Sequence, residues 1–416
     1  MTKRLTIFAV LLITGLTAFA QTYDEVSVGS QYSQQAYYTL STGAVKAVNN
    51  DAWDIAFSNV GQIDAGIFIN ESASLTGTPV NLFLAPTTDW SAAITDVTGF
   101  VDDARIYNAE LNWSEGAFNE VKDPNNPLDY GWGAYNVQNH QIVGDKVFVV
   151  QKRNGSFIKL KIDALKSGYY HFRYANLDGT NEVIDSVAKA TNGANSIVHY
   201  SFETKQIVSI ANDYDLVFTR YFTPLDAGGG EIIEYAVTGI LLAPGTEAVV
   251  ADGVDVTTVK EEDYAANYTA LPTILGHDWK VFDFTAGWIL DEDRANFVKT
   301  KSGEKYKLVF VDFTGSGTGT TTIEKTKLET ASTSVQPEGR QISFYPNPVK
   351  EALYISTPTQ EDVEVSIFNS LGQRILYKET GTNRSISLPS NVSAGTYHAL
   401  VQGTNWKTSH SFIVVN

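Results

Sequence analysis

The chain has 416 residues, of which 43% are hydrophobic, so it is long enough for two or three domains with ordinary cores. Its formal net charge of −17 argues against nucleic acid and anionic lipid as partners, because both reward basic surfaces. It contains no cysteine, which excludes disulfide bonds, thiolate metal sites and a lipid-anchored cysteine.

The N-terminus has the pattern of an export signal. Lys3 and Arg4 precede the apolar run LTIFAVLLITGLTAFA, which ends on small residues. A basic start, a short apolar segment and a small-residue end are typical of a cleaved secretory signal peptide. We therefore expect residues 1–20 to be removed and the mature protein to begin near Gln21. No later run approaches the roughly 20 apolar residues of a membrane span, so no transmembrane segment is expected in the mature protein.

A β-strand motif occurs twice, as DAWDIAF at residues 51–57 and as NDYDLVF at residues 212–218. The residues before it match as well, because YTLSTGAVKAVNND (38–51) aligns without a gap with YSFETKQIVSIAND (200–213). The alignment pairs Tyr38 with Tyr200, Leu40 with Phe202 and Asp51 with Asp213, and after a one-residue gap at Ala52 it pairs Trp53 with Tyr214 and Asp54 with Asp215.

A second match fixes the far end of this repeat. VVQKRNGSFIKLKI (149–162) aligns without gaps with FVKTKSGEKYKLVF (297–310). Each segment has two strand-like runs around Asn-Gly or Ser-Gly, which suits a tight hairpin because glycine accepts a positive φ. We therefore predict a duplicated domain, with copy one at residues 22–185 and copy two at residues 186–326.

Both copies are rich in strand-forming residues. Runs such as KVFVVQ, YYHFRYA, EIIEYAVTGILLA and YKLVFVDF contain mainly β-branched and aromatic residues. No long stretch keeps the 3.6-residue apolar period of a helix. The pattern predicts an all-β fold with two tandem β-rich domains.

The composition changes after the repeat. Residues 327–341 have Ser, Thr, Pro and charge but almost no large apolar residue, so we expect an extended linker. Residues 342–416 then show short strand-like runs separated by turn residues, which is typical of a small immunoglobulin-like β-sandwich.

The C-terminal unit contains YPNPV, LGQ and SAGTY in that order. These elements resemble the type A C-terminal sorting domain of the type IX secretion system; an ordinary immunoglobulin-like module is the alternative. The resemblance implies export across both membranes, interaction with the secretion machinery, and a secreted or outer-membrane-surface location. The motif residues are Pro346, Asn347, Pro348, Gly372, Gly395 and Tyr397.

The repeat resembles the HmuY family in the order of its motifs. These are AYYTLSTGAVKAVNNDAWDIAF, GWGAYNV, KVFVVQKRNGSFIKLKI and GYYHFRYANL in copy one, with DWKVFDFTAGW replacing the tryptophan segment in copy two. The resemblance implies two tandem HmuY-like domains, and it implies haem as the ligand and a host haemoprotein as a source of haem.

Haem iron needs an axial donor such as His, Met, Cys or Tyr. By resemblance the donor lies between the tryptophan segment and the last hairpin, where copy one has His140 and copy two has no histidine. Trp132 and Tyr135 could stack on the flat ligand, although aromatic residues at this density are more often core residues. The expected haem-binding residues are therefore His140, Trp132 and Tyr135.

No catalytic motif and no metal-ligand spacing is found, so we expect a non-enzymatic binding protein. Two alternatives remain open. One is a surface interaction or adhesion module that has lost its haem ligands. The other is a carbohydrate-active enzyme, which rests only on the acidic loops VDDAR (101–105), KEED (260–263) and LDEDR (290–294).

Overall fold

The computed structural model describes residues 21–61, 64–210, 213–328, 342–369, 373–404 and 406–415. The chain forms two compact units, Met1–Leu328 and Glu329–Asn416. Among the described residues, strands alternate with loops and single-turn 3₁₀ helices, so the predicted all-β class is confirmed. The expected signal peptide, and residues 329–341 of the expected linker, lie outside the described residues. None of the described segments contains a helix of the length and hydropathy that a membrane span requires.

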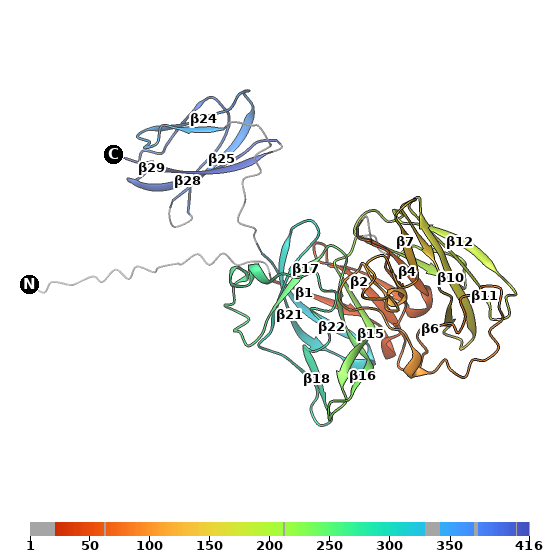
Figure 1. Ribbon diagram of the computed structural model, residues 1–416. Coiled ribbons are helices and arrows are strands. Elements are labelled where there is room, and N and C mark those ends of the chain that lie inside the picture. Colours follow the sequence, from red (N-terminus) through yellow and green to blue (C-terminus); the bar gives the residue numbers. More distant parts are fainter. Residues whose placement is uncertain are drawn as a thin grey trace, which may run out of the picture. The chain divides into compact units, whose positions relative to one another are not determined.

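Two larger antiparallel sheets form the outer parts of the first unit (Figure 1). The five-stranded sheet has the order β1 (Gln21–Ser27), β22 (Thr320–Leu328), β21 (Lys305–Phe313), β20 (Ala295–Lys299), β17 (Glu247–Ala251). The seven-stranded sheet has the order β12 (Val183–Ala188), β11 (Tyr169–Asn176), β10 (Phe157–Lys166), β8 (Gln141–Gly144), β7 (Gly133–Asn136), with β9 (Phe148–Gln151) between β10 and β6 (Asn81–Leu84).

Two four-stranded sheets and one hairpin complete the first unit. The sheets have the orders β14 (Gln206–Val208), β13 (Ser196–Ser201), β4 (Ile55–Asn59), β5 (Ile67–Ile69), and β16 (Ile232–Leu242), β15 (Leu216–Asp226), β2 (Gln34–Thr39), β3 (Ala44–Asn49); β18 (Lys280–Asp283) pairs with β19 (Gly287–Leu290). The 3₁₀ turns are Ser30–Tyr32, Asn50–Ala52, Asp102–Ala104, Ala117–Asn119, Glu261–Asp263, Ala265–Asn267 and Gly315–Gly317.

The first hairpins of the two repeat copies are exchanged. Strand β2 pairs with β15, which comes from the second copy, whereas β13 from the second copy pairs with β4 of the first. The register is the same in both pairs, since Tyr38 lies opposite Leu216 and Tyr200 lies opposite Ile55. Each half of the repeat therefore completes a sheet of the other half.

One carboxylate fixes each exchanged hairpin. The Asp54 carboxylate accepts a hydrogen bond of 2.6 Å from the main-chain N–H of Phe202, and the Asp215 carboxylate accepts one of 2.8 Å from that of Leu40. The main-chain N–H groups of the same two aspartates donate to the carbonyls of Tyr200 and Tyr38, both at 2.9 Å. Residues matched in the sequence are thus matched in the structure.

The glycine hairpins also correspond. The β9–β10 turn has Gly155 at φ 80° and the β20–β21 turn has Gly303 at φ 86°, the left-handed region that glycine adopts without strain. In each turn the glycine N–H donates at 2.8 Å to the carbonyl of the residue three positions earlier, Lys152 or Thr300.

The two largest hydrophobic cores of the first unit cross the expected boundary at residue 185. One core joins β4–β12 residues such as Phe57 and Tyr170 to Tyr200, and the other joins Val26 and Tyr38 to residues after Leu216. The structure differs here from two tandem domains that each have a core built from their own residues. The physical reason is that a hairpin can make the same contacts within its own copy or in the neighbouring one, so a sequence match cannot tell which sheet the hairpin joins.

The second unit has two antiparallel sheets with one buried core between them. The sheets have the orders β23 (Ser343–Tyr345), β24 (Ala352–Ser356), β27 (Ser385–Ser387), and β26 (Arg374–Gly381), β25 (Asp362–Asn369), β28 (Gly395–Gln402), β29 (Lys407–Val414). This is the predicted small sandwich.

The described residues of the predicted sorting motif lie after β23 and in β28. Pro346 and Pro348 follow β23, and the side chain of Asn347 between them accepts a hydrogen bond of 2.9 Å from the N–H of Ile413 in β29. Gly395 begins β28, where the buried Tyr397 donates its hydroxyl proton to the Ser393 carbonyl at 2.8 Å. Gly372 lies outside the described residues.

Candidate functional site

The structure brings two of the three expected haem-binding residues together. Tyr135 is in β7 and His140 is in the turn before β8, where its φ of 56° closes the hairpin. The Tyr135 hydroxyl lies 2.8 Å from the His140 Nδ1, and the His140 side chain is exposed. Trp132, by contrast, is fully buried in the core, and its Nε1–H donates to the Ala65 carbonyl at 2.9 Å.

The hairpin β18–β19 occupies the same place in the second half. Trp279 precedes it as Trp132 precedes β7, and the Trp carbonyl accepts a bond from the residue after the hairpin in both halves, Asp291 and Asp145. This hairpin has no histidine and exposes Phe282 and Phe284 instead. The two hairpins therefore occupy matching places in the fold but present different side chains.

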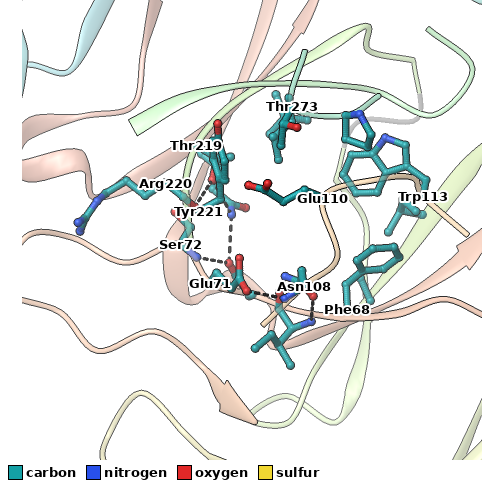
Figure 2. Close-up of a pocket in the computed structure, with 18 of the residues that line it drawn as sticks. Phe68, Glu71, Ser72, Asn108, Glu110, Trp113, Thr219, Arg220, Tyr221 and Thr273 are labelled. Carbon is teal, nitrogen blue, oxygen red and sulfur yellow. Dashed lines mark hydrogen bonds between the residues drawn. The ribbon is translucent and has the colours of Figure 1, made fainter. Parts of the chain in front are cut away.

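A cavity of about 100 Å³ lies where the two exchanged sheets meet (Figure 2). We call it the interface cavity. Its walls come from β2, β4, β5, β13 and β15, from the loop 108–113, and from Pro272 and Thr273. None of His140, Tyr135 and Trp132 lines it.

Two aromatic pairs on matched positions form one wall of the interface cavity. Trp53 packs edge-on against His199 with ring centroids 4.7 Å apart, and Tyr214 packs edge-on against Tyr37 at 4.9 Å. Trp53 matches Tyr214 in the repeat, and Tyr37 matches His199. The same contact is therefore built twice with different side chains.

A buried amide joins these walls to the polar part of the cavity. The Gln35 carbonyl oxygen accepts hydrogen bonds from Trp53 Nε1 at 2.8 Å and from the Tyr37 hydroxyl at 3.2 Å. Its amide nitrogen donates to Asn70 Oδ1 at 3.1 Å and to the Thr219 hydroxyl at 3.2 Å. Because all four hydrogen-bonding positions of the amide are used, Gln35 is fixed in one orientation.

Four polar side chains that line the cavity lack a partner in the part of the chain that the structure describes. No hydrogen bond joins a described residue to the ring nitrogens of His199 or to the hydroxyls of Tyr214 and Tyr221. The Glu110 Oε1 is buried without a partner, and Figure 2 shows its carboxylate pointing into the cavity. Buried polar groups are normally paired, so His199 and Tyr221, which are 5% and 6% exposed, and the covered Glu110 Oε1 need an explanation.

Burial sets the charge of two groups in the cavity wall. It lowers the pKa of His199, which is 5% exposed, to about 3, so this ring is neutral at neutral pH. Burial also raises the pKa of Glu71 to about 7, although the main-chain N–H groups of Asn108 and Phe222 donate to its oxygens at 2.8 and 3.3 Å. The Glu71 carboxylate is therefore held by the main chain.

Neither of the two nearby arginines forms an ion pair with Glu110. Arg220 Nη1 donates to the carbonyls of Ala73 and Ser74 at 2.9 and 3.1 Å, and Figure 2 shows its guanidinium directed away from the cavity. Arg105 does not line the cavity; its guanidinium stacks on Phe222, 4.4 Å from the ring centroid, and lies 3.7 Å from Asp102.

Comparison with known proteins assigns parts of both units. Residues 31–174 match the model of the HmuY protein family. Residues 343–415 match the model of the secretion system C-terminal sorting domain. The first unit is therefore similar over residues 31–174 to the HmuY family, and the second unit is similar to the sorting domain. The sorting domain supports a secreted or outer-membrane-surface protein that interacts with the secretion machinery.

Residues beyond 174 match no HmuY model, so the assignment of the second copy to this family stays a prediction. A search of curated proteins finds no match. Among solved structures, dimeric latent PorU from Porphyromonas gingivalis aligns over 67% of this chain at 12% identity, with a TM-score of 0.15. The chain spans 32% of the length of that protein.

The region similar to HmuY does not gather all three expected haem-binding residues in one place. His140 is one donor, and Tyr135 lies beside it. Trp132 is buried in the core and does not lie beside His140. Over the described ranges, no three His, Asp or Glu residues are grouped as metal ligands. The geometry at the β7–β8 hairpin offers one exposed imidazole whose Nδ1 is held by Tyr135.

Sequence reasoning did not find the interface cavity. Trp53 and Tyr214 were visible as aromatic positions of the repeated motif, but the motif predicted strands and not a site. Glu71 and Glu110 belong to no motif. They meet the aromatic pairs only in the folded chain.

Proposed function

We propose that this is a secreted or surface-displayed, non-enzymatic protein that binds a small molecule in the interface cavity. The observation that carries the proposal is the set of four cavity-lining polar side chains without partners. An apolar cavity needs no ligand, whereas a cavity lined by unpaired buried donors and acceptors loses free energy until something pairs with them.

A binding role is supported over a catalytic one by the state of the ionisable groups. His199 has no carboxylate or hydroxyl partner to orient it as a base, and both Glu71 oxygens accept main-chain hydrogen bonds. General acid–base catalysis needs a side chain free to exchange its proton with the substrate. This argument also weighs against the carbohydrate-active alternative.

The proposal is tested by filling the cavity from its rim. Thr273→Trp places an indole inside the cavity, and Thr88→Trp adds the same side chain at an exposed loop position as the matched control. Small aromatic probes such as 2-phenylethanol are titrated into the mature chain, and binding is followed by calorimetry and by the fluorescence of Trp53 and Trp113.

We expect the wild type and the Thr88 variant to bind and the Thr273 variant not to bind. Equal binding by both variants, or no binding by the wild type, would contradict the proposal and favour a surface interaction module.

Haem at the β7–β8 hairpin is a second candidate. The observation that favours it is the hydrogen bond of 2.8 Å between Tyr135 and His140 Nδ1, because a held Nδ1 directs Nε2 outward as a metal ligand. The match to the HmuY family also supports it. Haem or a host haemoprotein is titrated and the visible spectrum is recorded. His140→Ala should abolish the spectral response and Tyr135→Phe should weaken it; an unchanged response in both variants would exclude this site.

A further inference from the structure

The interface cavity presents one uncompensated negative charge. Glu110 lies in the loop 108–113, and its carboxylate is directed into the cavity with Oε1 fully covered and unpaired (Figure 2). It forms no ion pair with any residue that the structure describes; Arg220 bonds main-chain carbonyls, and the ion-pair contact of Arg105 is with Asp102 at 3.7 Å. A carboxylate oxygen that is covered without a partner is costly, and a cation is the partner that would offset this cost.

Aromatic rings face the same space. Phe68 and Trp113 lie beside each other with ring centroids 5.4 Å apart, and Figure 2 shows them across the cavity from Tyr221. Trp53 and Tyr214 line the neighbouring wall. The faces of aromatic rings attract cations and also pack against apolar groups. These residues therefore suit a ligand that has a cationic group and an apolar body.

The remaining polar groups define the other end of the ligand. The neutral His199 ring and the Tyr214 hydroxyl can exchange one hydrogen bond each with an uncharged group. The volume of about 100 Å³ limits the occupant to a small molecule.

We infer that the interface cavity takes a small organic cation, an ammonium group on an aromatic or aliphatic body, with the ammonium at Glu110 and the body against Phe68 and Trp113. The inference deepens the proposed function and rests on it. Glu110 supplies the ion pair, the aromatic residues supply the surface, and His199 with Tyr214 accepts a polar substituent at the far end.

Three probes of one shape separate charge from fit. They are 2-phenylethylamine, which is cationic at neutral pH, 2-phenylethanol, which is neutral, and phenylacetate, which is anionic. Calorimetric titration of the mature chain should show the amine binding about tenfold more tightly than the alcohol, the size expected for one partly buried charge pair, and phenylacetate binding least.

Glu110→Gln keeps the shape of the side chain and removes its charge. This variant should bind the amine and the alcohol within about twofold of each other, with the alcohol affinity close to that of the wild type. Glu234→Gln is the matched control, because Glu234 is close enough to interact electrostatically with Glu110 but is exposed and does not line the cavity. It should keep the preference for the amine.

The outcomes separate the two levels of the proposal. One outcome is that the alcohol binds the wild type but not Thr273→Trp, while the amine binds no more tightly than the alcohol. In that case the binding function stands and the cationic class of ligand is wrong. A preference for the amine that persists in Glu110→Gln also overturns the inference. If none of the three probes binds the wild type, the cavity holds only water and the proposed function fails with it.

Discussion

Asp54 and Asp215 hold matching positions in the two halves of the first unit, and each accepts a hydrogen bond from the hairpin of the other half. The Asn-Gly and Ser-Gly turns and the hairpins after Trp132 and Trp279 also correspond. The framework of main-chain hydrogen bonds was therefore kept in both halves.

The side chains that this framework presents are different. His199 faces Trp53 in one half where Tyr37 faces Tyr214 in the other. The first half contributes the loop with Glu110 to the cavity wall, and the second half contributes Pro272 and Thr273. A similar backbone with unlike side chains makes an asymmetric cavity.

The largest expected effect is on the pH dependence of stability, and it comes from replacing His199 so that the two aromatic pairs become more alike. The pKa of His199 is lowered from 6.5 to about 3 in the folded protein, so below pH 6.5 the unfolded chain binds a proton that the folded chain does not. The contribution of the neutral ring to the free energy of unfolding is complete above pH 6.5. It decreases as the pH falls toward 3, by roughly 5 kcal/mol at most.

His199→Tyr, which copies the residue at Tyr37, should remove this part of the pH dependence. Urea unfolding of the mature chain at neutral and at acidic pH measures it, with the wild type as the reference. If the variant loses as much stability on acidification as the wild type, His199 is not the buried neutral ring described here.

A smaller effect tests whether the two halves are equivalent. Asp54→Ala and Asp215→Ala each leave one buried main-chain N–H, of Phe202 or Leu40, without its acceptor, which should cost about 1–3 kcal/mol. Because burial raises the pKa of both carboxyls, their environments are alike, and we expect similar losses.

Equilibrium unfolding measures these losses, with Asp51→Ala as an exposed control that should be nearly neutral. A large loss in one half together with no loss in the other would show that the two hairpins are held differently.

The smallest effect separates the two tryptophans. Trp132 Nε1 donates to the Ala65 carbonyl at 2.9 Å, whereas the buried Nε1 of Trp279 has no hydrogen-bond partner. Trp132→Phe should therefore cost about 1 kcal/mol more than Trp279→Phe, since only the first substitution removes a hydrogen bond. Thermal unfolding of both variants checks the difference, and equal costs would mean that both indoles contribute only by packing.

The sequence by itself determined the all-β class, the small C-terminal sandwich and the residues that correspond between the two halves. Strand-forming runs, turn glycines and the repeated motif are local signals, and each survives in the structure as a strand, a turn or a matched contact. The pairing of Tyr38 with Tyr200 and of Asp54 with Asp215 in the alignment became two identical hydrogen-bond patterns.

Only the tertiary structure decided which half each hairpin completes, and with it the position of the cavity. A hairpin can pair in the same register with the matching strand of its own copy or of the other copy. No local sequence pattern therefore tells whether the hairpins are exchanged. Trp132 shows the same limit, because a tryptophan beside a predicted site can equally well be a core residue, as it is here. Glu71 and His199 come from distant segments, and the shifted pKa of each follows from removal from water, which depends on the complete packing of both halves.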